Sequence, residues 1–212
     1  STPSLILGTY NRAVEDAIDR ASESTNLEER ARLFDKAGEL ASKYLVKARA
    51  MQRQKYICLA FQELAKIYEL TNRPSDAIPC RSNADAEFKK YLSQPNAVDE
   101  QANYECYRIT NLFVLSVDYE LFDISQSRRY LEEADRAARE YHTIENGELG
   151  LSTNRGLYDQ CERLGDLLYA RGDIDGALSC YKLQKAFAST QPESREALTR
   201  VKDKIARLSK HS

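Results

Sequence analysis

The chain has 212 residues, of which 42% are hydrophobic and 30% charged, and its formal net charge is −2. This mixture supports a packed core and excludes a wholly disordered chain. The near balance of charge argues against a surface built for nucleic acid, which normally carries a large basic excess. No apolar run approaches the ~18 residues that cross a bilayer, so we expect no insertion into a membrane.

The N-terminal residues carry no visible signal peptide, because the apolar patch Leu5–Leu7 lacks a basic flank. The length of the chain fits one compact unit, so we expect a single helical-repeat domain over residues 1–212. Ser1 stands where an initiator methionine would, which is consistent with a fragment of a longer protein. The cysteines are too far apart in sequence to form a metal or redox pair. They are typical of small core residues in a reducing compartment, which predicts a cytoplasmic location, with the nucleus as the alternative. The five are Cys58, Cys80, Cys106, Cys161 and Cys180.

Apolar residues recur at three- and four-residue spacing through almost the whole chain, which is the period of an amphipathic helix. Glycine and proline are few, at eight and five, which disfavours an all-β fold with its many turns. The spacing predicts nine helices, near residues 5–22, 26–47, 51–71, 75–92, 98–121, 125–142, 154–171, 174–189 and 193–209.

Glycine and proline mark the connections between these helices. Pro74 suits the first turn of a helix, so a helix is expected to end before it. Gly172 can adopt the left-handed conformation that closes a helix, which predicts a tight connector. Residues 145–150 are turn-rich and are expected to form a surface loop. Pro79 falls inside a predicted helix and is expected to kink that helix or shorten its start.

Two stretches of the chain share one pattern of small residues. Ala65 precedes Ala77 by twelve residues, and Gly165 precedes Ala177 by the same number. The two registers are 100 residues apart, which we interpret as three steps of roughly 33 residues. That step predicts a middle repeat whose second helix ends near Ala134, marked by Ser127, Leu131 and Ala134.

The segment from Cys161 to Tyr181, which contains RLGDLLYARGDIDGALSCY, resembles the tetratricopeptide repeat (TPR), and Phe61 to Ala84 resembles it as well. The resemblance implies an all-α fold: a right-handed α-solenoid of about four antiparallel helix pairs with a C-terminal capping helix. It also implies a protein–protein interaction scaffold or adaptor that takes part in complex assembly and needs no cofactor. Pieces such as ARLFDKAGELASKY also resemble the attachment proteins of vesicle-fusion machinery.

In TPR arrays the first helix of each pair lines a concave groove, so the resemblance implies a set of partner-binding residues. Chaperone-binding members hold a C-terminal carboxylate there with Lys, Asn and Arg, whereas this chain is mainly acidic at these positions. That difference predicts a basic or amphipathic protein segment as the partner. The alternative is a solvated acidic face without a ligand. The predicted groove residues are Glu15, Asp19, Gln62, Glu63, Lys66, Leu112, Phe113, Glu162, Arg163 and Asp166.

The sequence offers little for catalysis. The only histidines, His142 and His211, lie far from any cysteine pair, so no metal site is expected. No Gly-rich phosphate loop and no nucleophile elbow are present. We therefore predict a protein that is not an enzyme and has no catalytic residues. The basic stretch from Arg200 to Lys210 is expected to form the capping helix, with a contact to acidic partners or nucleic acid as the alternative.

Two other functions remain open on the sequence alone. The chain could be a self-association module that forms a homodimer within a larger protein. It could also be a vesicle-fusion attachment factor, which would require partners from a membrane complex.

Overall fold

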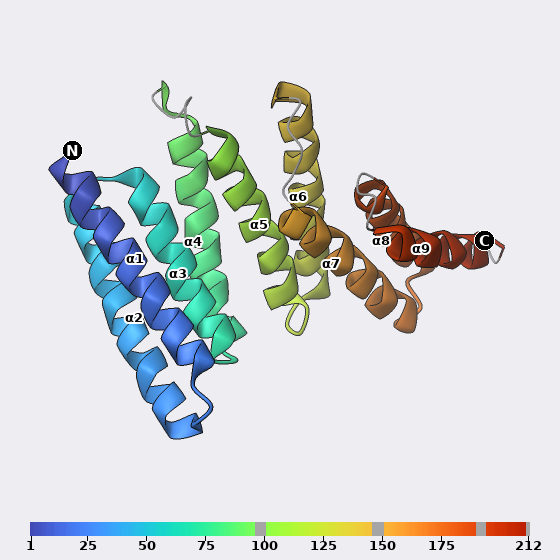
Figure 1. Cartoon of the computed structure of the whole chain (residues 1–212). Helices are drawn as coiled ribbons and strands as arrows, with labels where there is room; N and C mark the ends of the chain where they lie inside the picture. Colours follow the sequence, from blue (N-terminus) through green and yellow to red (C-terminus); the bar gives the residue numbers. More distant parts are fainter. Residues whose placement is uncertain (96–100, 146–150, 190–193, 211–212) are drawn as a thin grey trace. The chain divides into compact units, whose positions relative to one another are not determined.

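The computed structural model describes residues 1–95, 101–145, 151–189 and 194–210. Its ordered elements are helices, with no strand in these ranges, and they fall into two compact units, residues 1–101 and 102–212 (Figure 1). The first unit contains α1 (Thr2–Glu23), α2 (Leu27–Ala50), α3 (Gln54–Leu70) and α4 (Pro74–Leu92). The second is built from α5 (Gln101–Tyr119), α6 (Ile124–Glu145), α7 (Leu151–Ala170), α8 (Ile174–Ala188) and α9 (Arg195–Leu208).

The predicted all-α fold of four helix pairs and a final helix is confirmed across the described residues. In the first unit each helix packs on the next one along the chain, and α1 also packs on α3. In the second unit α8 packs on both α7 and α9. The expectation of one domain over residues 1–212 remains a prediction.

Three helices end in the same backbone conformation. Gln52, Asn72 and Gly172 have positive φ angles of 52°, 57° and 83°. In each case the next residue's N–H bonds to a carbonyl five residues back, as Asp173 N does to Leu168 O at 2.9 Å. This arrangement closes the helix and satisfies a terminal carbonyl. The predicted helix end before Pro74 and the predicted connector at Gly172 are therefore confirmed.

The helix that contains Pro79 begins earlier than expected. α4 starts at Pro74, one residue before the predicted start, and continues past Pro79. The proline ring removes a single hydrogen bond, to the carbonyl of Ser75. Ala77 and Ala84, on either side, are fully buried, so packing holds this part of the helix in place. The predicted shortening is wrong, and a kink at Pro79 remains a prediction.

The spacing of the repeats differs from the prediction. α4, α6 and α8 begin at residues 74, 124 and 174, a step of 50 residues. Ala77, Ser127 and Ala177 occupy matching positions and are all fully buried. The step of roughly 33 is therefore wrong, and α6 continues to Glu145 instead of ending near Ala134. The long helices explain the error, since 100 residues hold two such pairs and not three.

Small residues allow close helix packing in the second unit. A Cβ atom on Gly165 would lie 2.5 Å from the Tyr181 ring, and a Cβ on Gly156 would lie 2.5 Å from the Phe113 ring. Neither distance is possible for a real side chain without movement of the ring. Gly165 therefore brings α7 against α8, and Gly156 brings α7 against α5.

Candidate functional site

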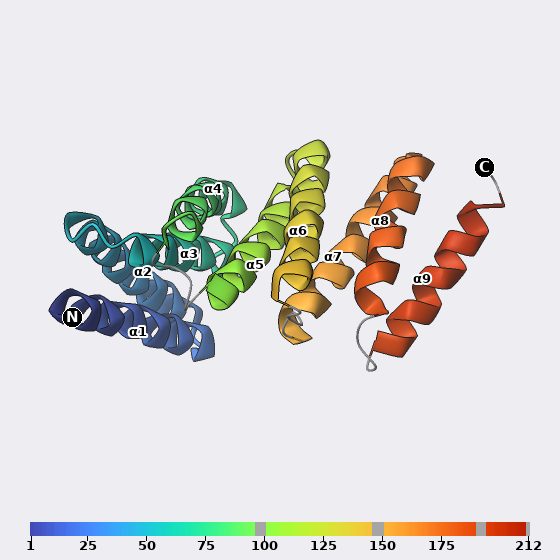
Figure 2. The ribbon, with the colours of Figure 1, turned by 90° about the horizontal axis from the view of Figure 1, so that it is seen from above.

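The two acidic groove residues predicted on α7, Glu162 and Asp166, are bound by the last helix of the chain. Arg200 donates to both carboxylate oxygens of Glu162, at 3.0 and 2.9 Å. Lys204 donates to Glu162 at 2.9 Å and to Asp166 at 2.8 Å. Figure 2 shows α9 beside α8 at this end of the second unit. The acids of α7 are thus neutralised within the chain.

These contacts make Glu162 a structural residue. Hydrogen bonds from Arg200, and then from Lys204, lower the pKa of Glu162 from its ordinary 4.5 to about 2, although burial opposes the shift. Lys204 also lies 5.3 Å from the centre of the Tyr181 ring, and the Tyr181 hydroxyl donates to Asp166 at 2.6 Å. The basic residues near the C-terminus therefore attach α9 to α7, in agreement with the predicted capping helix.

Two predicted groove residues belong to the core of the second unit. Leu112 is fully buried, and Phe113 packs against the same core cluster and against Gly156. The prediction that they line an open groove is wrong for Leu112, because its side chain has no exposed surface. The apolar character of this pair reflects core packing and not a binding surface.

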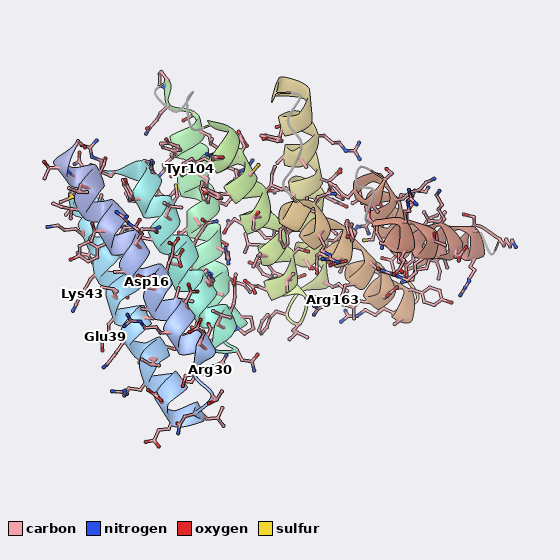
Figure 3. All side chains as sticks on the ribbon, viewed as in Figure 1. Asp16, Arg30, Glu39, Lys43, Tyr104 and Arg163 are labelled. Atoms are coloured by element: carbon pink, nitrogen blue, oxygen red, sulfur yellow. The ribbon has the colours of Figure 1, made fainter. Side chains whose placement is uncertain are left out.

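Arg163 is the remaining predicted residue on α7. Its side chain is 64% exposed, and its Nε donates at 3.0 Å to Glu120, whose side chain is only 5% exposed. Figure 3 labels Arg163 on α7. The pair joins α7 to the end of α5, so part of this side chain is committed to the fold.

The predicted groove residues of the first unit lie on α1 and α3. Glu15 and Asp19 on α1 are exposed, and Asn11 donates to Glu15 at 3.1 Å. Gln62 and Glu63 on α3 are half-buried. We call Glu15, Asp19 and Glu63 the acidic surface. Among the described residues of the first unit, no lysine or arginine forms an ion pair with these three carboxylates.

Lys66 lies at the edge of the acidic surface. It is exposed, one helical turn after Glu63. Burial raises the pKa of Glu63 from 4.5 to about 7, and Lys66 opposes this rise while Glu15 and Asp19 add to it. The structure thus brings charged groups from α1 and α3 within electrostatic range of one another. The sequence alone did not indicate that Glu63 would be more buried than Glu15 and Asp19.

Sequence reasoning missed Tyr44, the residue that lies beneath the acidic surface. Tyr44 on α2 is fully buried, its ring stacks on Tyr10, and its hydroxyl has no hydrogen-bond partner among the described residues. Burial raises the pKa of this hydroxyl, and the charges of Glu63 and Glu15 add to the effect. An apolar stripe containing a tyrosine would have been the only sequence signal.

A groove between α2 and α3 was also missed. It has a volume of about 630 Å³, with Phe34, Leu64 and Tyr68 among its lining residues. Gly38 lies in its wall, and a Cβ atom there would meet nothing within 4 Å. Figure 3 shows Glu39 and Lys43, which also line the groove, projecting from the edge of α2 away from α1. None of the lining residues of this groove belongs to the acidic surface.

The described residues contain no group of three or more His, Cys, Asp or Glu side chains that could hold a metal ion. The side chains of His142 and His211 lie outside the described residues. The five cysteines form no disulfide: Cys58, Cys161 and Cys180 are buried as predicted, whereas Cys80 and Cys106 are half-buried. Burial raises the pKa of Cys180 to about 11, which keeps that thiol protonated. In the same part of the chain, no helix is both long and apolar enough to span a membrane.

Comparison with known proteins identifies the fold. No family model and no curated protein matches this sequence. The crystal structure of BtubC (BKLC) from P. vanneervenii is similar, with a TM-score of 0.56, 16% identity, and coverage of 99% of this chain and 84% of that one. A P. anserina protein described as a kinesin light chain with nearly identical TPR-like repeats has a TM-score of 0.59 and 14% identity, and the match covers 100% and 94% of the two chains. The chain therefore has a TPR-like helical-repeat fold.

Proposed function

We propose that this chain is a non-enzymatic scaffold that binds a basic or amphipathic segment of another protein on the acidic surface of its first unit. TPR-like arrays are a fold on which protein-interaction surfaces are built, so the fold favours this class of function. The partner, an adaptor role in a larger complex and a cytoplasmic or nuclear location belong to the same proposal.

The observation that carries the proposal is the contrast between the acids of the two units. Glu162 and Asp166 already bind Arg200 and Lys204 of α9. Among the described residues of the first unit, no basic side chain forms an ion pair with the exposed Glu15 or Asp19 of α1. A basic segment can therefore gain contacts on the first unit without displacing part of the chain, whereas on α7 it would compete with α9.

The α9 contact is also an example of the chemistry that we propose. α9 presents Val201 and Leu208 to the core of the second unit while its basic side chains reach the carboxylates of α7. An apolar stripe gives such a helix affinity, and the charge pairs set its position. We expect the partner segment to combine basic residues with apolar ones in a similar way.

Charge reversal on α1 tests the proposal. The partner is first isolated by affinity purification and identified by mass spectrometry, and its dissociation constant is then measured with purified proteins. We expect the double variant Glu15→Lys with Asp19→Lys to weaken binding at least about tenfold, because two attractive contacts become repulsive.

The matched control is Asp35→Lys with Glu39→Lys. These two acids are also four residues apart on one helix and exposed, but they line the α2–α3 groove. The control changes the net charge by the same amount, so it should alter affinity only slightly. Loss of binding in the control, with unchanged binding in the α1 variant, would move the partner site to the α2–α3 groove and reject the proposal.

A further inference from the structure

The α2–α3 groove is open to solvent, and the proposed function does not use it. Its volume is about 630 Å³, within the range of cavities that bind ligands in proteins. Its floor is apolar, because Phe34, Leu64 and Ile67 line it, each with only 3% to 8% of its surface exposed. The groove therefore combines an open entrance with a firmly packed apolar floor.

The α2 wall of the groove contains small side chains. Ala31, Gly38 and Ser42 lie on one face of α2, at spacings of seven and four residues. A Cβ atom on Gly38 would meet nothing within 4 Å, whereas one on Gly165 would lie 2.5 Å from the Tyr181 ring. Glycine destabilises the interior of a helix, and the packing of the described residues gives no reason for one at position 38. We interpret the open space there as room for a chain that approaches from outside.

The rim of the groove carries its charges in a fixed order. Asp35, Glu39 and Lys43 follow one another along α2, one helical turn apart, and all three are exposed. Figure 3 labels Glu39 and Lys43 on this edge of α2. None of the three forms a side-chain hydrogen bond or an ion pair among the described residues. Along α2 the order is thus negative, negative and positive, over about 12 Å.

Arg73, the remaining charged residue of the lining, already has partners. Its Nε donates to Asp76 at 2.8 Å, and its guanidinium group lies 4.8 Å from the centre of the Tyr68 ring. The charge of Arg73 is therefore largely balanced within the chain. The charges that an occupant meets are those of the α2 rim.

The walls of the groove favour a helix over an extended segment. Both walls are helices, whose backbone N–H and C=O groups are bonded within each helix. An extended segment would find few partners there for its own backbone, whereas a helix brings its backbone already bonded. Apolar side chains on one face of such a helix can contact Phe34, Leu64 and Ile67.

The order of the rim charges sets the direction of the bound helix. A helix is commonly acidic in its first turn and basic in its last, because these charges complement its dipole. When such a helix lies antiparallel to α2, its first turn faces Lys43 and its last turn faces Glu39 and Asp35. In the parallel direction, like charges would face one another.

We propose that the α2–α3 groove binds a helix of a second protein partner, antiparallel to α2, with an acidic first turn and a basic last turn. The α2 wall extends from Ala31 to Lys43, so about 12 residues of the partner helix, or about 18 Å, fit along it. This site lies outside the acidic surface and does not depend on the proposed function. With both sites, one chain can hold two protein segments.

The test uses a synthetic helical peptide of about 15 residues, with leucines at i, i+4 and i+7, glutamates in its first turn and lysines in its last. Fluorescence anisotropy measures its binding to the whole chain. A photoreactive diazirine at either end then shows, by mass spectrometry, which residues lie beside that end. We expect the N-terminal diazirine to label the stretch around Ser42 and Lys43, and the C-terminal one to label the stretch around Ala31 and Asp35.

Asp35→Lys with Lys43→Asp reverses the order of the rim charges and keeps the net charge. We expect this variant to bind the peptide in the opposite direction, so that the two labelled stretches are exchanged. Gly38→Leu is the second variant. Its side chain enters open space and leucine favours the helix, so the melting temperature should stay the same or rise. The same side chain obstructs the groove and should weaken binding at least about tenfold.

Labelling within the groove that charge reversal exchanges, together with the loss of affinity in Gly38→Leu, supports the site. Absence of binding, or binding that Gly38→Leu leaves unchanged, overturns it. Labelling of α1 would place the peptide on the acidic surface and also overturns the groove site. Labelling that is the same in the charge-reversed variant contradicts the proposed direction. These results leave the charge-reversal test of Glu15 and Asp19 unaffected, so the two proposals can fail separately.

Discussion

At the residue scale, two mid-helix glycines have opposite roles. A Cβ atom on Gly165 would collide with the buried ring of Tyr181, whereas one on Gly38 would meet nothing within 4 Å. Gly165→Ala should therefore lower the free energy of unfolding by about 1–3 kcal/mol, the usual cost of overpacking. Gly38→Ala should raise it by up to about 1 kcal/mol, because alanine favours the helix. Chemical denaturation measures both, and equal effects would contradict the packing described for α7 and α8.

Glu63 should destabilise the first unit when it is ionised. Its pKa in the folded chain is about 7, above the ordinary 4.5. A raised carboxyl pKa means that its favourable contribution is complete below about pH 4.5 and is lost as pH rises through 7. Glu63→Gln should therefore increase stability by about 1–3 kcal/mol at pH 8 and have little effect at pH 4. Thermal unfolding at both pH values checks this, and a larger gain at pH 4 would show that the sign is wrong.

At the element scale, the docking of α9 depends on ionised Glu162. Its pKa of about 2 is below the ordinary 4.5, so the stability it contributes is present above pH 4.5 and disappears as pH falls to about 2. Glu162→Gln should lower the free energy of unfolding of the second unit by about 1–3 kcal/mol at pH 7, a value moderated by the exposure of Arg200. The difference from the unchanged chain should shrink near pH 2. Urea denaturation followed at both pH values would reveal it, and an undiminished difference at low pH would exclude the charge pairs as the cause.

The sequence predicted the helices well because each carries its own signal. Apolar spacing located the nine helices of the described residues, and Pro74 and Gly172 marked connections that local backbone geometry requires. The length of one repeat was harder to predict from the sequence. Two matching stretches 100 residues apart are compatible with two long helix pairs as well as with three short ones.

The functional residues were harder to predict than the helices. Leu112 looked like a groove residue, yet it is buried in the core. Glu162 looked free, yet a helix that begins more than thirty residues later binds it. Both errors concern contacts between distant segments, and helical periodicity carries no information on which neighbour covers a given face.

At the scale of the whole molecule, binding of a partner on the acidic surface needs one copy of the chain. Neither self-association nor a role in vesicle fusion is supported by a specific contact in the described residues, and both remain predictions. We expect light scattering to give the 24.2 kDa mass of a single chain, independent of concentration. A mass that doubles with concentration would favour homodimerisation, and capture of a fusion ATPase or a helical-bundle component would favour the attachment-factor role.

The most direct measurement of the central claim is hydrogen–deuterium exchange of the whole chain with and without its isolated protein partner. Peptides that cover residues 11–19 of α1 and 62–66 of α3 should exchange more slowly in the complex, because a basic segment then covers the acidic surface. Exchange in α7 and α9 should be unchanged, because Glu162 and Asp166 are already bound by Arg200 and Lys204. Protection confined to the α2–α3 groove, or to α7 and α9, would contradict the account.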